Sequence, residues 1–359
     1  MTSQDLARNQ LTGPVLIIGA GLLGTSIGLA LSGHGISVRL RDHNPEHVRT
    51  ASGLGAGVAD QGGLDPQLVV VAVPPEHLGV TIQAALEEFP FAVVTDIGSV
   101  KSEPLRHLSS GLERYVGSHP MAGSERSGPL AASAALFDGR PWAITPHAAS
   151  TPAAVASVVA LARLCRATEI LTTPLEHDRA VATISHVPYV VAVLMAGHLT
   201  DAPSEHLALA GQGVRDVTRV AASDPMLWQQ ILRLNADAVL APLRALQDDL
   251  SELVGAISGS EPERLLDVLA RGVSGTEAIP GKHGGPGRPL RSVFVSVPDH
   301  PGELARLFVD AGTSEVNIED VHIDHDPGRP MGLVELVVAE ERAEHLLVSL
   351  ESRGWVTHR

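Results

Sequence analysis

Cysteine and lysine are almost missing from this chain of 359 residues. Cys165 is the one cysteine, which excludes an internal disulfide and a cysteine-based zinc cluster. We expect it to be a small buried apolar residue, and we expect no metal site. Lys101 and Lys282 are the only lysines, and the formal net charge is −15. Because binding to phosphates requires clustered Lys and Arg, the composition argues against a nucleic-acid partner.

Long apolar runs are missing as well. No stretch approaches the roughly 18 uninterrupted apolar residues that a membrane helix needs, and the N-terminus lacks the apolar run of a signal peptide. We therefore expect a cytoplasmic protein with no membrane partner. The length predicts two or three domains. An anionic substrate would have to be bound by individual arginines, against the negative field of the whole molecule.

The first apolar run is residues 14–19, and a glycine-rich turn, residues 19–24, follows it. Small and apolar residues come next, so the pattern predicts a strand, a tight turn and a helix whose N-terminus can meet a pyrophosphate. Asp42 follows a second predicted strand, residues 37–41, where a carboxylate would bind an adenosine ribose. We expect NAD as cofactor; NADP stays possible because Arg41 lies beside Asp42. A turn without a nucleotide is the alternative. The proposed cofactor contacts are Gly19, Gly21, Leu22, Leu23, Gly24, Asp42, Val73 and Pro74.

Further buried strands are predicted by short apolar runs with helix-compatible segments between them. These runs are residues 68–73, 92–96, 142–144 and 169–171. Their alternation with helices indicates an α/β fold with a mostly parallel, doubly wound Rossmann-type sheet over residues 13–173. Ligands of such sheets bind beyond the carboxyl ends of the strands, so Val73, Pro74 and residues 96–99 should form lips of the nicotinamide pocket.

Residues 174–276 have a different character. Residues 175–199, 204–222 and 225–253 lack strand alternation and predict long helices, and therefore an all-helical second domain. Its apolar positions, as at residues 190–195 and 239–243, exceed what one amphipathic face needs. A buried homodimer interface would account for the surplus.

A third unit is predicted after residues 277–290, which are rich in Gly and Pro and indicate a flexible linker. Residues 291–359 have the order βαββαβ and resemble the ACT domain, a small fold that senses amino acids. The resemblance implies an aromatic amino-acid effector bound near Asp299, Gly302 and Asn317. A structural or dimerising unit without a ligand is the alternative, because a fold alone does not determine a function.

Residues 119–128 read HPMAGSERSG and are the most chemically suggestive stretch of the chain. Glycine and serine behind a His-Pro step predict a loop at a strand end, and such loops carry function more often than packing. A histidine with a reference pKa of about 6.5 suits the role of a base near neutrality, and positioned acid–base help is worth about 10² to 10⁴ in rate. A structural imidazole is the alternative for His119.

Five short motifs, in this order along the chain, resemble the prephenate and arogenate dehydrogenases of tyrosine biosynthesis. They are residues 96–101 (DIGSVK), 119–125 (HPMAGSE), 185–188 (SHVP), 213–220 (GVRDVTRV) and 224–228 (DPMLW). The resemblance covers roughly residues 13–280. It implies NAD-dependent oxidative decarboxylation of a cyclohexadienol: prephenate would give 4-hydroxyphenylpyruvate, and arogenate would give tyrosine directly.

The same resemblance implies roles for individual residues. His119 would be the catalytic base, and Ser99 would hydrogen-bond both this histidine and the reacting hydroxyl. Arg219 would pair with a substrate carboxylate, for which the planar guanidinium is suited. Arg215, four residues earlier on the same predicted helix face, would serve a second carboxylate or the mouth of the site. The remaining implied substrate contacts are Ser124 and Glu125 as gate residues, His186, Tyr189 and Trp228.

Two features of the first long predicted helix affect the substrate. Pro188 removes a backbone donor, so a kink there would direct His186 at the cleft. Tyr189 stands where the family often has a second histidine, which leaves prephenate and arogenate both open. His177 and Asp178, just before, also fit the family pattern, but charge at a helix start would explain them equally.

Two other classes of protein are possible. A β-hydroxyacid dehydrogenase on the same plan would need a lysine on the first long helix of the second domain, and residues 174–276 contain no lysine. A non-catalytic sensor of nucleotides and amino acids would not need His119, Ser99 and Arg219 together. A tyrosine-pathway dehydrogenase therefore remains the preferred interpretation.

Overall fold

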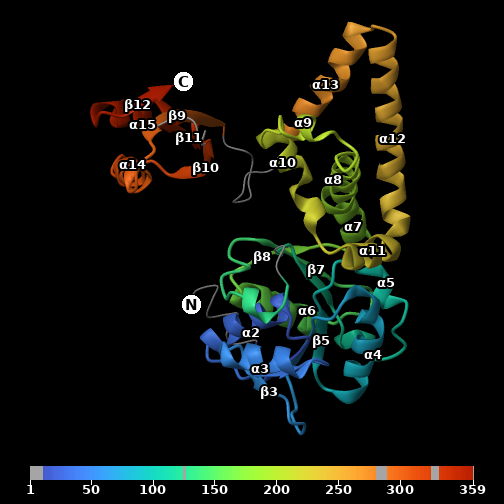
Figure 1. Cartoon of the computed structure of the whole chain (residues 1–359). Helices are drawn as coiled ribbons and strands as arrows, with labels where there is room; N and C mark the ends of the chain where they lie inside the picture. Colours follow the sequence, from blue (N-terminus) through green and yellow to red (C-terminus); the bar gives the residue numbers. More distant parts are fainter. Residues whose placement is uncertain (1–10, 124–126, 280–288, 325–330, 359) are drawn as a thin grey trace. The chain divides into compact units, whose positions relative to one another are not determined.

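The computed structural model describes residues 11–123, 127–279, 289–324 and 331–358. Its contacts divide the chain into residues 1–252 and residues 253–359, and the two units are described separately. The first unit is built on a parallel sheet of five strands in the order β3-β2-β1-β4-β5. Its two edge strands, β3 and β5, are labelled in Figure 1. The strands are β1 (Val15–Ile18), β2 (Val38–Arg41), β3 (Val58–Ala59), β4 (Leu68–Val71) and β5 (Val93–Asp96). This confirms the predicted Rossmann-type sheet.

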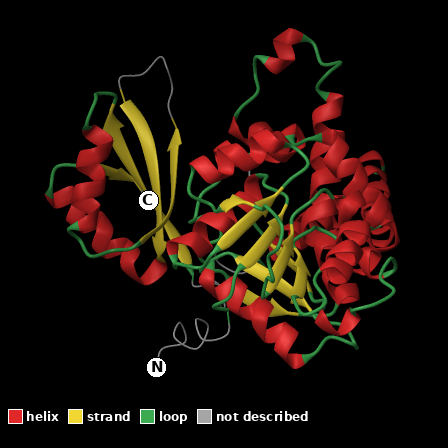
Figure 2. Ribbon diagram, turned by 90° about the horizontal axis from the view of Figure 1, so that it is seen from below, coloured by secondary structure: helices red, strands yellow, loops and turns green. Residues whose placement is uncertain are grey.

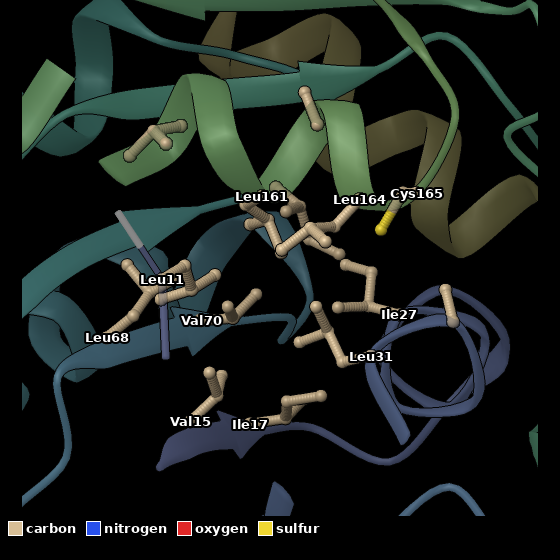
Figure 3. Packing of buried hydrophobic residues seen from close by; sticks show 14 of the residues in the cluster. Leu11, Val15, Ile17, Ile27, Leu31, Leu68, Val70, Leu161, Leu164 and Cys165 are labelled. Carbon is tan, nitrogen blue, oxygen red and sulfur yellow. The ribbon is translucent and has the colours of Figure 1, made fainter. Parts of the chain in front are cut away.

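Alternation along the strands gives the sheet two buried faces, with helices on both (Figure 2). Val15 and Ile17 of β1 pack on one face against α2 (Leu22–Gly33) and α6 (Pro152–Leu164), while Leu16 packs on the other against α4 (Leu78–Glu88). Figure 3 shows Val15, Ile17, Leu68 and Val70 of the strands near Ile27 and Leu31 of α2. Cys165 lies in this cluster and is buried, as predicted.

The connections of this layer are short elements. They are α3 (Pro45–Gly53), η1 (Pro75–His77), α5 (Ser102–Leu105), η2 (Leu112–Arg114) and η3 (Pro129–Ala131).

A separate three-stranded sheet follows, and it corrects two predictions. It consists of β6 (Gly117–Pro120), β7 (Pro141–Thr145) and β8 (Thr168–Leu171); β6 is antiparallel to β7, and β7 is parallel to β8. The prediction that residues 142–144 and 169–171 extend the first sheet is therefore wrong. His119 belongs to β6 and pairs with Ala143, so the HPMAGSERSG stretch begins in a strand. Strand β6 escaped prediction because its four residues, GSHP, have no apolar alternation.

The helical part contains more breaks than predicted. Its elements are α7 (Pro174–Val181), the π-helical turn η4 (Ala182–His186), α8 (Val187–His198), α9 (Ser204–Leu207), α10 (Gln212–Thr218), η5 (Arg219–Ala222), α11 (Pro225–Leu234) and α12 (Ala236–Ser258). The irregularity expected at Pro188 is the turn η4, in which the N–H of Val187 bonds the carbonyl of Ala182. Arg215 and Arg219 lie on consecutive elements, α10 and η5, and not on one helix.

One helical stretch of this part is long and apolar. Among the described residues, Pro174–His198 is the stretch whose length and mean composition would allow it to cross a membrane, although charged and polar residues interrupt its apolar run. Core helices of globular proteins satisfy the same criterion. The stretch carries His177, Asp178 and His186 as buried polar residues, and these have a place in the site described below.

The second unit contains α13 (Pro262–Glu277) and a small α/β domain. Its elements are β9 (Leu290–Pro298), α14 (Glu303–Gly312), β10 (Ile318–Asp324), β11 (Met331–Ala339), α15 (Glu340–Ser352) and β12 (Val356–His358). The order βαββαβ is confirmed, and the antiparallel sheet has the order β10-β11-β9-β12. Most of the predicted linker lies outside the described residues.

Candidate active site

The glycine-rich turn has the geometry of a pyrophosphate cradle. Gly19 has a φ of +110°, and a Cβ there would lie 2.2 Å from the carbonyl oxygen of Ala72. A Cβ on Gly24 would lie 1.9 Å from the carbonyl oxygen of Gly19. A Cβ on Gly21, by contrast, would meet no atom within 4 Å, although Gly21 caps the N-terminus of α2. Two glycines thus permit the close packing, and the third leaves open space where the helix amides meet a ligand.

Asp42 and Arg41 point to different partners. The carboxylate of Asp42 accepts from the backbone N–H of Ala20 at 2.7 Å, so it faces the glycine turn as an adenosine-binding acid should. The guanidinium of Arg41 pairs with Asp60 at 2.6 Å and with Glu88 at 2.7 Å. Because two carboxylates already pair with Arg41, its position beside Asp42 is no longer an argument for NADP as the cofactor.

A chain of hydrogen bonds leads from His119 into the helical part. Nδ1 of His119 lies 2.9 Å from Nε2 of His177, and the two rings meet edge to face. Nδ1 of His177 lies 2.9 Å from Oδ1 of Asp178. His177 and Asp178 are 2% and 3% exposed, whereas His119 is only partly buried. The partly accessible imidazole is thus supported by two groups that solvent does not reach.

Asp178 also holds the loop that follows β5. Its carboxylate accepts from the backbone N–H groups of Lys101 and Ser102, both at 2.8 Å. Ser99 lies in the same loop and is partly buried. The Asp178 side chain thereby joins helix α7 to the end of the DIGSVK loop and to the residue after it, so Ser99 and His119 are both linked to the His177–Asp178 pair.

Lys101 and Asp96 form a fully buried ion pair beneath this loop. The ammonium group also donates to the carbonyl of Ser118, at 2.7 Å, and Asp96 accepts from the Tyr115 hydroxyl at 2.7 Å and from the Gly98 N–H at 2.9 Å. A buried charge pair persists only when its remaining hydrogen-bonding capacity is met, as it is here. The pair connects the end of β5 to β6, directly before His119.

The electrostatics favour a neutral imidazole at position 119. Burial, then the repulsion that a second proton would meet from His177 and Lys101, holds the pKa of His119 well below its ordinary value of 6.5. Burial also lowers the pKa of His177. Burial alone would raise the pKa of Asp178, but hydrogen bonds from His177 and Ser102 hold it below its ordinary value. At neutral pH the site thus combines an ionised carboxylate with two neutral imidazoles.

A second cluster surrounds His186, which is 2% exposed. Its ring meets Trp228 edge to face at 5.9 Å, and Trp228 stacks on the buried ring of Tyr189 at 3.6 Å. The side-chain amide of Asn235 donates to the carbonyl of Asp178 at 2.9 Å and lies 3.1 Å from Nδ1 of His186. The structure thus brings together three predicted substrate residues, and Asn235 joins them to the His177–Asp178 pair.

For the other predicted site residues the structure gives the burial and the neighbouring elements but few direct contacts. Val73 is partly buried and Pro74 exposed at the end of β4; the η1 segment after them meets α11 through a hydrogen bond of 3.0 Å from Gln230 to Glu76. Arg215 and Arg219 are exposed, on elements that pack against α8. Ser124 and Glu125 lie outside the described residues. The hydrogen bond expected from Ser99 to His119 stays a prediction; the structure gives Nδ1 of His119 the partner His177.

Some members of the cluster were missed by sequence reasoning. For His177 and Asp178 the sequence also allows a simple helix-start charge, Asp96 is predicted only as part of a lip of the nicotinamide pocket, and Lys101 and Asn235 have no predicted role. The available signal was the type of residue: a lone lysine in a strand-end motif, and a His-Asp pair at the start of a long, mostly apolar helical stretch. Their partners, however, lie far away in sequence, as Asp178 does from Lys101, and only the fold reveals them.

The sheet topology, the glycine cradle and the supported imidazole at the sheet end define a Rossmann-type, nicotinamide-dependent dehydrogenase. Comparison with known proteins specifies the family. Residues 27–171 match the nucleotide-binding domain of prephenate dehydrogenase, and residues 173–271 match its dimerization domain. The chain belongs to the prephenate dehydrogenase family, whose members are NAD-dependent oxidoreductases.

Individual relatives agree. The chain is 37% identical to the probable prephenate dehydrogenase NovF of Streptomyces niveus, over 95% of this chain and 98% of that protein. It is 33% identical to the cyclohexadienyl dehydrogenase of Zymomonas mobilis, over 70% and 91%. The prephenate dehydrogenase of A. aeolicus, solved with hydroxyphenyl propionate and NAD+, has a TM-score of 0.69 at 26% identity and covers 75% of this chain and 99% of its own.

Proposed function

We propose that the protein oxidatively decarboxylates prephenate to 4-hydroxyphenylpyruvate, with His119 as the base. The observation that carries the proposal is the partly accessible, neutral imidazole held by buried partners that also bond the loop after β5. A base must be unprotonated and within reach of its substrate to act. Arogenate is the alternative substrate, since it carries the same ring hydroxyl and ring carboxylate.

The chain's residues divide the chemistry between them. Bound NAD supplies the hydride acceptor, and the glycine cradle with Asp42 would hold it. His119 takes the proton of the ring hydroxyl as the carbinol carbon is oxidised. Loss of CO2 then makes the ring aromatic and needs little help from the protein. Binding a dianion is the harder task for a chain of net charge −15, and we assign it to Arg219, assisted by Arg215.

His119→Asn tests the catalytic role. We expect the rate of NADH formation with prephenate to fall by about 10² to 10⁴, because general-base help of that size is lost. The dissociation constant for NAD should not change. His107→Asn is the matched control, since His107 is an exposed imidazole whose side-chain partner among the described residues is Glu103. A purified wild-type enzyme that oxidises neither prephenate nor arogenate would remove the proposal.

Substrate preference is tested by initial rates with both substrates and both cofactors. Tyr189 cannot act as the second histidine of the family motif, and its ring is already stacked on Trp228. The stacked rings of Tyr189 and Trp228 form a surface that is apolar except at the phenol oxygen and the indole nitrogen. We expect the enzyme to prefer NAD to NADP because Asp42 faces the cofactor turn and Arg41 is engaged elsewhere.

We also propose that the protein is a cytoplasmic homodimer. The match of residues 173–271 to a dimerization domain supports this, as do exposed apolar residues of α8. These residues are Val191, Val193, Leu194 and Met195. Several exposed apolar side chains on one helix are typical of a subunit interface.

The βαββαβ domain is proposed to be an ACT domain that binds an aromatic amino acid. Gly302 supports this, because it begins α14 with a φ of +97° and so forms a tight strand-to-helix loop after Asp299. Asn317, just before β10, bonds Glu319 at 2.8 Å. Inhibition of the full-length enzyme by tyrosine should be weakened at least about tenfold in Asn317→Ala, the cost of one to two hydrogen bonds. Equal tyrosine sensitivity of the two proteins would count against this.

A further inference from the structure

We propose that His177 and Asp178 are positioning residues that select Nε2 of His119 as the basic nitrogen. The inference rests on the proposed function of His119 and adds a specific role for the two residues behind it. A neutral imidazole has one N–H and one bare nitrogen, and only the bare nitrogen can accept a proton. Which of the two faces the substrate is decided by what the other one bonds.

The selection begins at Asp178. Its carboxylate has no proton to give, because it is ionised and already accepts from the backbone N–H groups of Lys101 and Ser102, and its Oδ1 lies 2.9 Å from Nδ1 of His177. Nδ1 of His177 must therefore carry a proton. Since the His177 ring is neutral, its Nε2 is bare.

The same logic passes from His177 to His119. The bare Nε2 of His177 lies 2.9 Å from Nδ1 of His119, so Nδ1 of His119 donates and carries the proton of that ring. Nε2 of His119 is then bare. When the substrate hydroxyl gives up its proton, the proton goes to this Nε2, and the N–H on Nδ1 stays bonded to His177. The resulting imidazolium has both protons directed at acceptors.

The pair is held rigidly enough to impose this choice. His119 is fixed by the backbone pairing of β6 with β7, and His177 and Asp178 are fixed in α7. The amide of Asn235 bonds the Asp178 carbonyl, and the Asp178 carboxylate bonds the loop after β5. The His119 ring is therefore oriented by its strand and by His177 before substrate binds. Such orientation in advance is what positioning contributes to catalysis.

Two variants of His177 separate this role from a structural one. In His177→Gln the Oε1 atom can take the place of Nε2 and accept from His119, whereas His177→Leu fills the space without an acceptor. We expect His177→Leu to lower kcat by roughly 10² to 10⁴ with KM and the NAD dissociation constant unchanged. His177→Gln should retain a kcat at least about tenfold higher than His177→Leu. Asp178 and its loop contacts are present in both variants.

Equal kcat values for the two variants, or a wild-type kcat in His177→Leu, would overturn the inference. A measurement on the unmodified enzyme covers the case in which His177→Leu does not fold. Nitrogen NMR of ¹⁵N-histidine-labelled protein at pH 8 should show His119, identified by loss of its signals in His119→Asn, with Nδ1 protonated and Nε2 bare. The reverse tautomer would refute the inference even if neither prephenate nor arogenate were oxidised, so its failure is distinguishable from that of the proposed function.

Discussion

The buried histidine His186 should make this protein sensitive to mild acid. Burial, then the nearby His177, lowers the pKa of His186 from 6.5 to about 4. The geometry gives the reason for its neutrality: the amide nitrogen of Asn235 faces Nδ1 of His186 and also donates to the Asp178 carbonyl. A proton on Nδ1 would meet a donor, and the amide cannot turn over without losing its second bond.

The sign and the size of the effect follow from linkage. The unfolded chain takes up a proton on His186 near pH 6.5, while the folded protein does so only near pH 4, so the folded state is favoured above pH 6.5 and loses this advantage as the pH falls. The whole shift corresponds to about 3 kcal/mol in the free energy of unfolding, of which about 2 kcal/mol is lost between pH 7 and pH 5.

His186→Asn isolates this contribution. The Asn side chain can place an oxygen near the former Nδ1 and accept from Asn235, but it does not titrate. Urea unfolding followed by circular dichroism at pH 7 and pH 5 should show that the wild type loses about 2 kcal/mol more than the variant. Parallel losses in the two proteins would mean that His186 is not held neutral by the fold, and the reasoning from burial would fail.

Two further predictions concern the ion pair and the glycine cradle. Lys101→Met should cost about 3–5 kcal/mol in the free energy of unfolding because it strands the buried Asp96 carboxylate, and Asp96→Asn in the same protein should recover part of that loss; thermal unfolding of the single and double variants checks this. Gly24→Ala should lower Tm, since its Cβ would lie 1.9 Å from a carbonyl oxygen, whereas Gly21→Ala should leave Tm unchanged yet weaken NAD binding at least about tenfold, as titration of protein fluorescence would show.

Local sequence patterns were sufficient for the Rossmann sheet and for the βαββαβ order. Strands β1 and β4 are continuous apolar runs, and the Gly19–Gly24 turn with Asp42 in register specifies the first crossover. Strand β6 was not predictable in the same way, because its pairing with β7 and not its composition makes it a strand. The interruption between α11 and α12 at Asn235 was not predictable for a similar reason. The Asn235 side chain bonds two groups that lie more than 45 residues away in the sequence.

The candidate base, His119, could also be predicted from the sequence, since a His-Pro step in a polar, glycine-rich stretch is unusual. Its supporting partners were not. The contacts of His119 with His177 and of Asp178 with the loop after β5 join segments that are 58 and 77 residues apart. Patterns over short windows report on helices and strands; they do not report on which polar groups meet in the folded chain.

The hydrogen bond between His119 and His177 joins a strand that follows the nucleotide-binding sheet to a helix that begins only after residue 173. A motion that separated this strand from this helix would pull the two imidazoles apart. The base would then be free to turn, and neither of its nitrogens would keep a fixed orientation toward a bound ring. The open enzyme would therefore be inactive while its site is accessible. Substrate could enter and bind before any proton is transferred to His119. In this way a single contact of 2.9 Å would make turnover conditional on closure.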